Sequence, residues 1–148
     1  MSSAPYIGTS HTSIIPVGSR VTCNPPPEDT DRDFLVLVPR DKYAAFCDAL
    51  LLDGWEVGGS LIPIDHDERG EEAHFNSFTR DGDNIIATAS AVFHRRFLAA
   101  SAVARKLNLM DKRQRIMLFQ AVLYAAIADP FFEPNGYEVF PLPVEALA

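Results

Sequence analysis

The sequence has 148 residues, of which 47% are hydrophobic and 22% are charged, and its formal net charge is −7. The composition is typical of a single globular domain spanning residues 1–148 and excludes a disordered chain, while the acidic balance argues against coating of a nucleic acid. Two cysteines exclude a disulfide framework and a four-cysteine zinc site, and no apolar run is long enough to cross a membrane. Because the first residues lack the basic and apolar segments of a signal peptide, we expect a cytoplasmic protein.

The first half of the chain predicts short strands around one helix. Residues 1–12 are small and polar, and we expect them to form a flexible arm. Apolar runs at 13–17 and 34–38 predict strands, the second of them buried and central. The proline-rich residues 21–30 predict a loop between these strands. Apolar residues at helical spacing predict a helix over 41–53.

The second half predicts a β-hairpin followed by two long helices. An Asp-Gly pair at 81–82 lies between two β-rich runs, which is a strong hairpin signal. The last predicted helix is apolar on nearly all sides, and such a helix usually lies at the centre of a core. The prolines after it predict an extended tail over 129–148. The predicted elements are strands 75–80 and 85–88 and helices 90–107 and 111–128.

These elements together predict an α/β (α+β) fold, in which a small mixed β-sheet packs against about three helices on one of its sides. A purely antiparallel sheet with helices at both ends is the alternative. Either arrangement fits one domain of this length, which can bury a sizeable core.

Charge is unevenly placed along the chain. Residues 1–74 contain 13 acidic and 5 basic side chains, whereas residues 75–148 contain 7 acidic and 8 basic ones. One interpretation is that these charges belong to ordinary solvated helix faces. The other is that a polyanion lies between an acidic, metal-binding part and a basic part. The basic part consists of Arg95, Arg96, Arg105, Lys106, Lys112, Arg113 and Arg115, with Asp111 as the one acid among them.

The segment from Gly18 to Asp33 carries the clearest chemical signal. Asp31 and Asp33 are two residues apart on an expected strand, so their side chains point to the same face. Two adjacent carboxylates repel each other unless a cation lies between them, and Mg²⁺ shares such ligands with substrate phosphates. Gly18 lets the backbone approach a phosphate, to which Ser19 can donate. The alternative is that the two acids are simply the solvated start of a strand.

The order of these residues resembles that of a known family. Gly18-Ser19, a loop, Asp31-x-Asp33 and an apolar strand are similar to the nucleotidyltransferase superfamily, which has the catalytic fold of DNA polymerase β. The longer stretches of sequence around these residues resemble small nucleotidyltransferase-like proteins encoded by tailed bacteriophages. The likeness covers about residues 13–127. Its most similar stretches are residues 18–27, 30–33, 84–88 and 118–124.

The resemblance implies transfer of a nucleoside monophosphate from a nucleoside triphosphate to an acceptor, with release of pyrophosphate and dependence on Mg²⁺ or Mn²⁺. Gly18, Ser19 and Arg20 would bind the triphosphate, and Asp31 and Asp33 would bind two metal ions. The acceptor would be RNA, a protein or a small molecule, in the host cytoplasm if the protein is phage-encoded. The alternative is a catalytically reduced relative that binds a nucleotide or a host or toxin protein.

One position departs from the family pattern. Members have a third carboxylate on a later strand, and the matching position here holds Asn84, a neutral residue and a poor substitute for a catalytic base. Asp83 is adjacent but faces the other way on a regular strand. A bulge after the hairpin turn would direct Asp83 inward, which makes it our candidate for the third catalytic carboxylate. Further candidates are Asp65, Asp67 and Asp81.

Two arginines outside this segment are further candidates for phosphate binding. Arg96 falls within the apolar face of the helix predicted at 90–107, from which it could reach a phosphate or turn toward solvent. Arg80 lies on the predicted hairpin. We therefore expect Arg80 and Arg96 to bind substrate together with Arg20.

Overall fold

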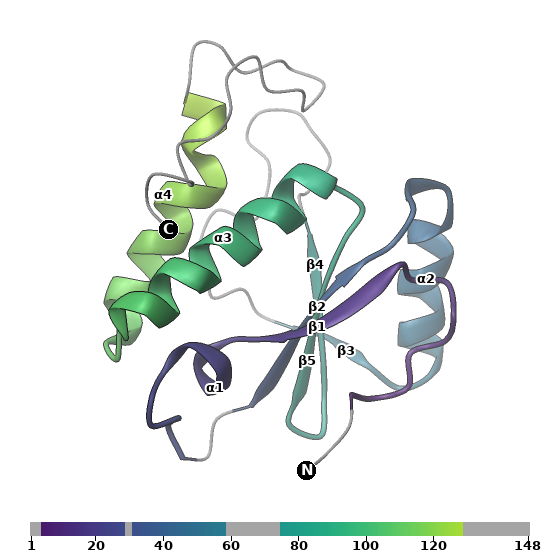
Figure 1. The fold of residues 1–148 in the computed structure, drawn as a ribbon. Helices are drawn as coiled ribbons and strands as arrows, with labels where there is room; N and C mark the ends of the chain where they lie inside the picture. Colours follow the sequence, from purple (N-terminus) through teal and green to yellow (C-terminus); the bar gives the residue numbers. More distant parts are fainter. Residues whose placement is uncertain (1–3, 29–30, 59–74, 129–148) are drawn as a thin grey trace.

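The computed structural model describes residues 4–28, 31–58 and 75–128. Within these ranges the chain forms a mixed α/β fold, as the sequence predicts, with one five-stranded sheet and four helices (Figure 1). None of the described helices is both long enough and apolar enough to cross a membrane. The predicted tail at 129–148 lies outside the described residues. In chain order the elements are β1 (Ser13–Val17), α1 (Ser19–Thr22), β2 (Arg32–Leu37), α2 (Arg40–Leu52), β3 (Glu56–Val57), β4 (Asn76–Arg80), β5 (Asp83–Thr88), α3 (Ala91–Leu107) and α4 (Lys112–Ala128).

The sheet has the strand order β1-β2-β5-β4-β3. β2 and β5 run parallel and the other neighbours are antiparallel, which makes the sheet mixed and overturns the purely antiparallel alternative. The hairpin between β4 and β5 turns at Asp81 and Gly82, whose φ angles of 50° and 83° fit the turn that an Asp-Gly pair favours. Because β2 and β5 are parallel, both strands begin at the same edge of the sheet.

Helices cover both faces of the sheet, whereas the sequence predicted helices on one side (Figure 1). Phe34 packs with Phe46 of α2 on one face. Leu35 packs with Phe97 of α3 and with residues of α4 on the other face. The cause lies in β2, because its run from Phe34 to Val38 is apolar at every position and successive side chains supply a core on each side.

Residues 4–12 pack more closely than a flexible arm would. Ile7 is 8% exposed and belongs to the core beneath α2. The backbone N–H of Thr12 donates to the Leu37 carbonyl oxygen (2.7 Å), which extends the pairing of β1 with β2. The short helix α1 was not predicted and overlaps the start of the loop predicted at 21–30. A helix of four residues is too short to show a helical period in the sequence.

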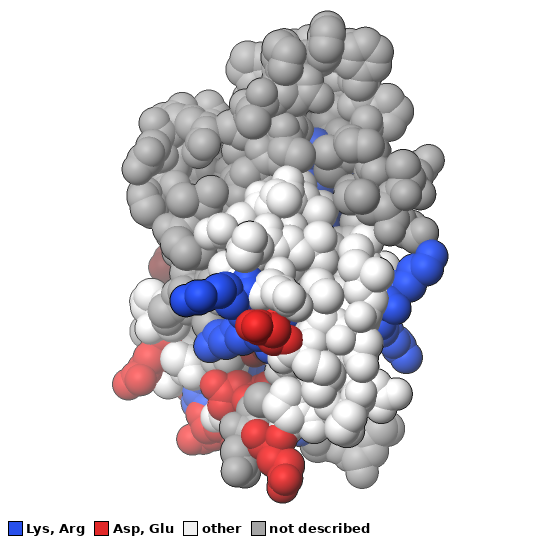
Figure 2. Space-filling model, turned by 90° about the vertical axis from the view of Figure 1, so that its left-hand side faces the viewer, with Lys and Arg blue, Asp and Glu red and all other residues white. Residues whose placement is uncertain are grey.

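Among the described elements, α4 packs mainly on α3, although its all-round apolar character predicts a central position. Val122 and Leu123 are buried against α3, but Met117 is 61% exposed. Figure 2 shows the side of the molecule that carries α3 and α4, where Lys and Arg side chains flank an uncharged area. The first turns of α4 line the pocket described below.

Candidate functional site

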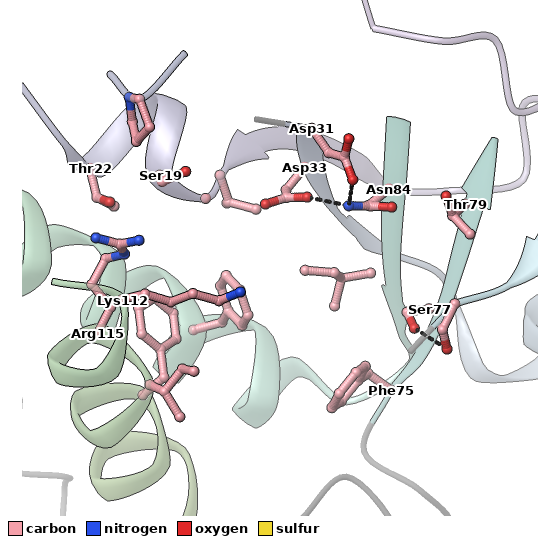
Figure 3. A pocket seen from close by; sticks show the side chains of 18 of the residues that line it. Ser19, Thr22, Asp31, Asp33, Phe75, Ser77, Thr79, Asn84, Lys112 and Arg115 are labelled. Atoms are coloured by element: carbon pink, nitrogen blue, oxygen red, sulfur yellow. Dashed lines mark hydrogen bonds between the residues drawn. The ribbon is translucent and has the colours of Figure 1, made fainter. Parts of the chain in front are cut away.

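Asp33 and Asn84 meet at the edge of the sheet where β2 and β5 begin. The two residues are partners in the parallel register, so their side chains project from the same face, which is the face of α3 and α4. Asn84 Nδ2 donates to Asp33 Oδ1 (2.8 Å) and to Asp31 Oδ2 (3.3 Å) (Figure 3). A single amide group therefore bridges both carboxylates of the predicted metal pair.

The ionised form of Asp33 lies in an unfavourable environment. Burial raises the pKa of the Asp33 carboxyl, and the nearby charge of Asp31 raises it as well. The hydrogen bond from Asn84 and the charge of Arg20 act in the opposite direction, and the net shift of the pKa is upward. A cation between the two carboxylates would favour the ionised form and offset this cost.

Gly18 allows the chain to pass directly over Asp33. Its φ of 86° and ψ of −173° define a conformation that is essentially restricted to glycine. A Cβ at this position would overlap Asp33 Oδ2 and would lie 3.0 Å from Asp33 Cβ. The chain then enters α1, where the N–H groups of Val21 and Thr22 donate to the Gly18 oxygen (2.9 and 3.0 Å). The predicted Gly-Ser turn thus lies against the acidic pair.

A pocket of about 800 Å³ opens beside this acidic edge, which is within the size range of small-molecule sites. The acidic pair and Ser19 lie on one side of it. Aromatic side chains contributed by three elements form much of the rest of the wall, namely Phe75 at the start of β4, Phe97 from α3 and Phe119 from α4. The pocket therefore combines a charged edge with a largely apolar interior.

Two basic side chains from the first turns of α4 lie across the pocket from the acidic pair. Figure 3 shows the Lys112 amine directed toward the middle of the pocket and the Arg115 guanidinium beside Thr22. Arg115 Nη1 donates to the Leu109 carbonyl oxygen (2.8 Å) and to Cys23 Sγ (3.2 Å). Arg115 therefore joins the start of α4 to the end of α1.

A second contact fixes the same two segments. The Asn24 N–H donates to Asn108 Oδ1 (2.9 Å), and Asn108 Nδ2 donates back to the Asn24 carbonyl oxygen (3.1 Å). Asn108 ends α3 in the left-handed region with φ of 49°, a conformation that asparagine tolerates better than most residues. Hydrogen bonds thereby tie the segment that follows α1 to the segment between α3 and α4, the latter being the helix from which Lys112 and Arg115 reach the pocket.

Asp83 does not face the pocket, so the prediction that it supplies the third carboxylate is wrong. The pairing of β5 is regular from Asp83 onward, and the side chain projects from the face opposite to that of Asn84. There its carboxylate accepts from Arg32 Nε (2.7 Å) and Arg32 Nη2 (2.8 Å). Of the other candidates, Asp81 is exposed in the hairpin turn, and Asp65 and Asp67 lie outside the described residues.

The predicted arginines are divided between different parts of the molecule. Neither Arg80 nor Arg96 is among the described residues that line the pocket, so the structure does not bring them to the acidic pair. Arg80 lies on the α2 face, where Nη1 donates to Asp53 Oδ2 (3.0 Å), because it follows the alternation of β4. Arg96 is 1% exposed, because it lies on the apolar face by which α3 packs into the molecule. Arg20 is exposed on α1, next to Ser19.

Sequence reasoning included Lys112 and Arg115 in a basic segment that could face a polyanion, but it did not single out either residue. The concentration of cations in residues 94–115 was the signal that could have identified them. The aromatic wall had no such signal, because apolar side chains that line a pocket have the same spacing as those that fill a core.

Asp31 and Asp33 fit one Mg²⁺ ion that is shared with a phosphate ligand. Mg²⁺ is usually held by one or two carboxylates together with substrate phosphates. If the Asn84 amide rotated so that its oxygen faced the carboxylates in place of Nδ2, that oxygen would be a neutral third ligand. No group of three His, Cys, Asp or Glu side chains is arranged to hold a metal ion in the part of the chain that the structure describes. A second ion therefore has fewer ligands here than the resemblance implies.

The function of this site has to be inferred from its own residues and from the resemblance carried by Gly18, Ser19, Asp31 and Asp33. No family model, curated protein or solved structure matches the chain.

Proposed function

We propose that the pocket binds a nucleoside triphosphate together with Mg²⁺ or Mn²⁺, as a nucleotidyltransferase-like protein with reduced catalysis. Asp31 and Asp33 would hold the metal, and the Gly18-Ser19 turn would contact the phosphates. The observation that carries this proposal is the bridge from Asn84 Nδ2 to both carboxylates, 2.8 and 3.3 Å long, at the edge of an 800 Å³ pocket.

Asn84 is the reason for placing binding ahead of transfer. In nucleotide transfer an acceptor oxygen attacks the α-phosphorus, the bond to the β-phosphate breaks, and pyrophosphate leaves. The acceptor must lose a proton, and an amide cannot take it. When bound, the metal ion would neutralise charge on the phosphate oxygens. The neighbouring Asp83 carboxylate is paired with Arg32 on the opposite face and cannot replace the missing acid.

Full nucleotidyl transfer is the second candidate, and one observation favours it. Asp31 and Asp33, the two carboxylates to which the resemblance assigns the metal ions of transfer, lie together at the edge of the pocket. In that case the acceptor would be RNA, a protein or a small molecule, and the two carboxylates would hold the metal.

Incubation with each labelled nucleoside triphosphate tests the two candidates. The protein is given Mg²⁺ or Mn²⁺, with and without a cell extract, and both bound label and transferred label are measured. Metal-dependent binding without transfer would support the binding protein. Label that moves onto RNA, protein or a small molecule would support the transferase. If none of the nucleotides binds in a metal-dependent way, both candidate functions are contradicted.

A further inference from the structure

The pocket has two walls of opposite charge. One carries Asp31 and Asp33, and the wall across from it carries Lys112 and Arg115 (Figure 3). A polyanion alone would be attracted by the second wall and repelled by the first, and a metal cation alone would meet the reverse. A polyphosphate that carries a divalent cation satisfies both walls at once.

The basic wall is built on contacts within the protein. Both hydrogen bonds of Arg115, to Leu109 and to Cys23, are made by Nη1, and a guanidinium has five N–H donors. The remaining donors suit the planar, bidentate recognition of a phosphate. Thr22 lines the pocket at this point, and Arg115 is itself half-buried, so its guanidinium lies at the pocket wall and not free in solvent.

We propose that Lys112 and Arg115, together with Ser19 and Thr22, form a phosphate subsite that does not depend on metal. This inference rests on the proposed function and deepens it, because it names the part of the pocket that holds the end of the phosphate chain. The ligand is then oriented. Its metal-bound phosphates lie at Asp31 and Asp33, and its terminal phosphate lies at the start of α4.

Binding of inorganic tripolyphosphate, measured by calorimetry with and without Mg²⁺, tests this subsite. Lys112→Gln should weaken binding about tenfold under both conditions, because one charge-assisted hydrogen bond is lost. Lys112 is an exposed first residue of its helix, so the substitution should leave the fold unchanged. Lys42→Gln, on the exposed surface of α2 at the other face of the sheet, is the matched control and should bind as the parent does.

Asp33→Asn separates this inference from the proposed function. Loss of a negative charge that faces the pocket should strengthen metal-free tripolyphosphate binding severalfold and should abolish the enhancement by Mg²⁺. If Lys112→Gln binds like the parent, the phosphate subsite is wrong, whatever Mg²⁺ does. If Mg²⁺ fails to enhance binding by the parent while Lys112→Gln still weakens it, the subsite stands and the metal site is wrong. Absence of tripolyphosphate binding by the parent under both conditions would overturn the subsite.

Discussion

Successive register pairs of β2 and β5 carry different side-chain contacts on the two faces of the sheet. On the α2 face, Arg32 and Asp83 are register partners and form a two-point ion pair, with both contacts below 3 Å. One residue further along each strand, on the α3 and α4 face, Asp33 and Asn84 are register partners. Here the partner of the carboxylate is an amide, which donates to Asp33 and to Asp31.

This difference shows how a sheet can carry a stabilising contact and a binding site on consecutive positions. The ion pair on the α2 face is complete within the protein and needs no ligand. The two carboxylates on the other face share one amide donor, and burial raises the pKa of Asp33 there. A carboxylate with a perturbed pKa beside a pocket is typical of a functional site.

The largest expected effect concerns Gly18, the glycine at which the chain passes directly over Asp33. Gly18→Ala should lower the free energy of unfolding by roughly 2–5 kcal/mol, because it adds both backbone strain and overlap with Asp33. Gly54→Ala is the control, because Gly54 has a φ of 97° but open space around its Cβ position. It should cost about 1–2 kcal/mol from strain alone. Equal losses in urea unfolding would show that the contact with Asp33 does not matter.

The next effect comes from placing a third carboxylate beside Asp31 and Asp33. Asn84→Asp replaces the amide donor by a third carboxylate, and without metal it should destabilise the protein by about 1.5–3 kcal/mol. Mg²⁺ alone should then raise the melting temperature of the variant much more than that of the parent. If the parent already transfers nucleotide weakly, the variant should transfer it faster. Equal responses of parent and variant to Mg²⁺ would show that Asn84 does not occupy a metal-ligand position.

A smaller effect should appear in the pH dependence of stability. Because the pKa of Asp33 is raised in the folded protein, its contribution to stability is fully present below the ordinary pKa of an aspartate and is lost as the pH rises through the raised value. Metal-free Asp33→Asn should therefore be as stable as the parent or more stable at pH 7. Its advantage should shrink as the pH falls through the raised pKa of Asp33 and should be gone below the ordinary aspartate pKa of about 4. Thermal melting of both proteins over this range measures the difference, and an advantage that grows on acidification would reverse the sign of the proposed shift.

The smallest effect concerns the contact that positions the basic wall. Asn108→Gly keeps a residue suited to positive φ but removes both hydrogen bonds to Asn24, and it should cost about 1 kcal/mol of stability. Tripolyphosphate binding should weaken severalfold, because Lys112 is then held less firmly. Unchanged binding with reduced stability would limit this contact to a structural role.

The sequence predicted the elements of the fold better than their arrangement. Alternation and caps are local properties, so the strand at 13–17 and the helices around 41–53, 90–107 and 111–128 were found within a few residues. The run from Phe34 to Val38 is apolar at every position and therefore indicates a core on each face of the sheet, but which helix covers which face depends on long-range packing that no local pattern states. The burial of Ile7 depends on a long-range contact in the same way.

The candidate site divides along similar lines. Asp31, Asp33, Gly18 and Ser19 lie in one segment, and their spacing alone predicts that they come together. The Asp33–Asn84 contact follows from the pairing of β2 with β5, which no local pattern predicts; the resemblance implied only that Asn84 takes the position of the family's third carboxylate. Lys112 and Arg115 reach the pocket only through the packing of α4 on α3, so their charge could be predicted but their position could not.

Melting of two matched variants tests the central claim most directly. Asp33→Asn and Asp83→Asn make the same chemical change on neighbouring positions of paired strands, one on each face. Each is compared with the parent, with and without Mg²⁺ and a nucleoside triphosphate. At one hundred times the dissociation constant the ligands should stabilise the parent by about 2.7 kcal/mol. Asp83→Asn should be less stable than the parent but keep this gain, whereas Asp33→Asn should be at least as stable and lose it. Equal ligand responses in the two variants would contradict the account.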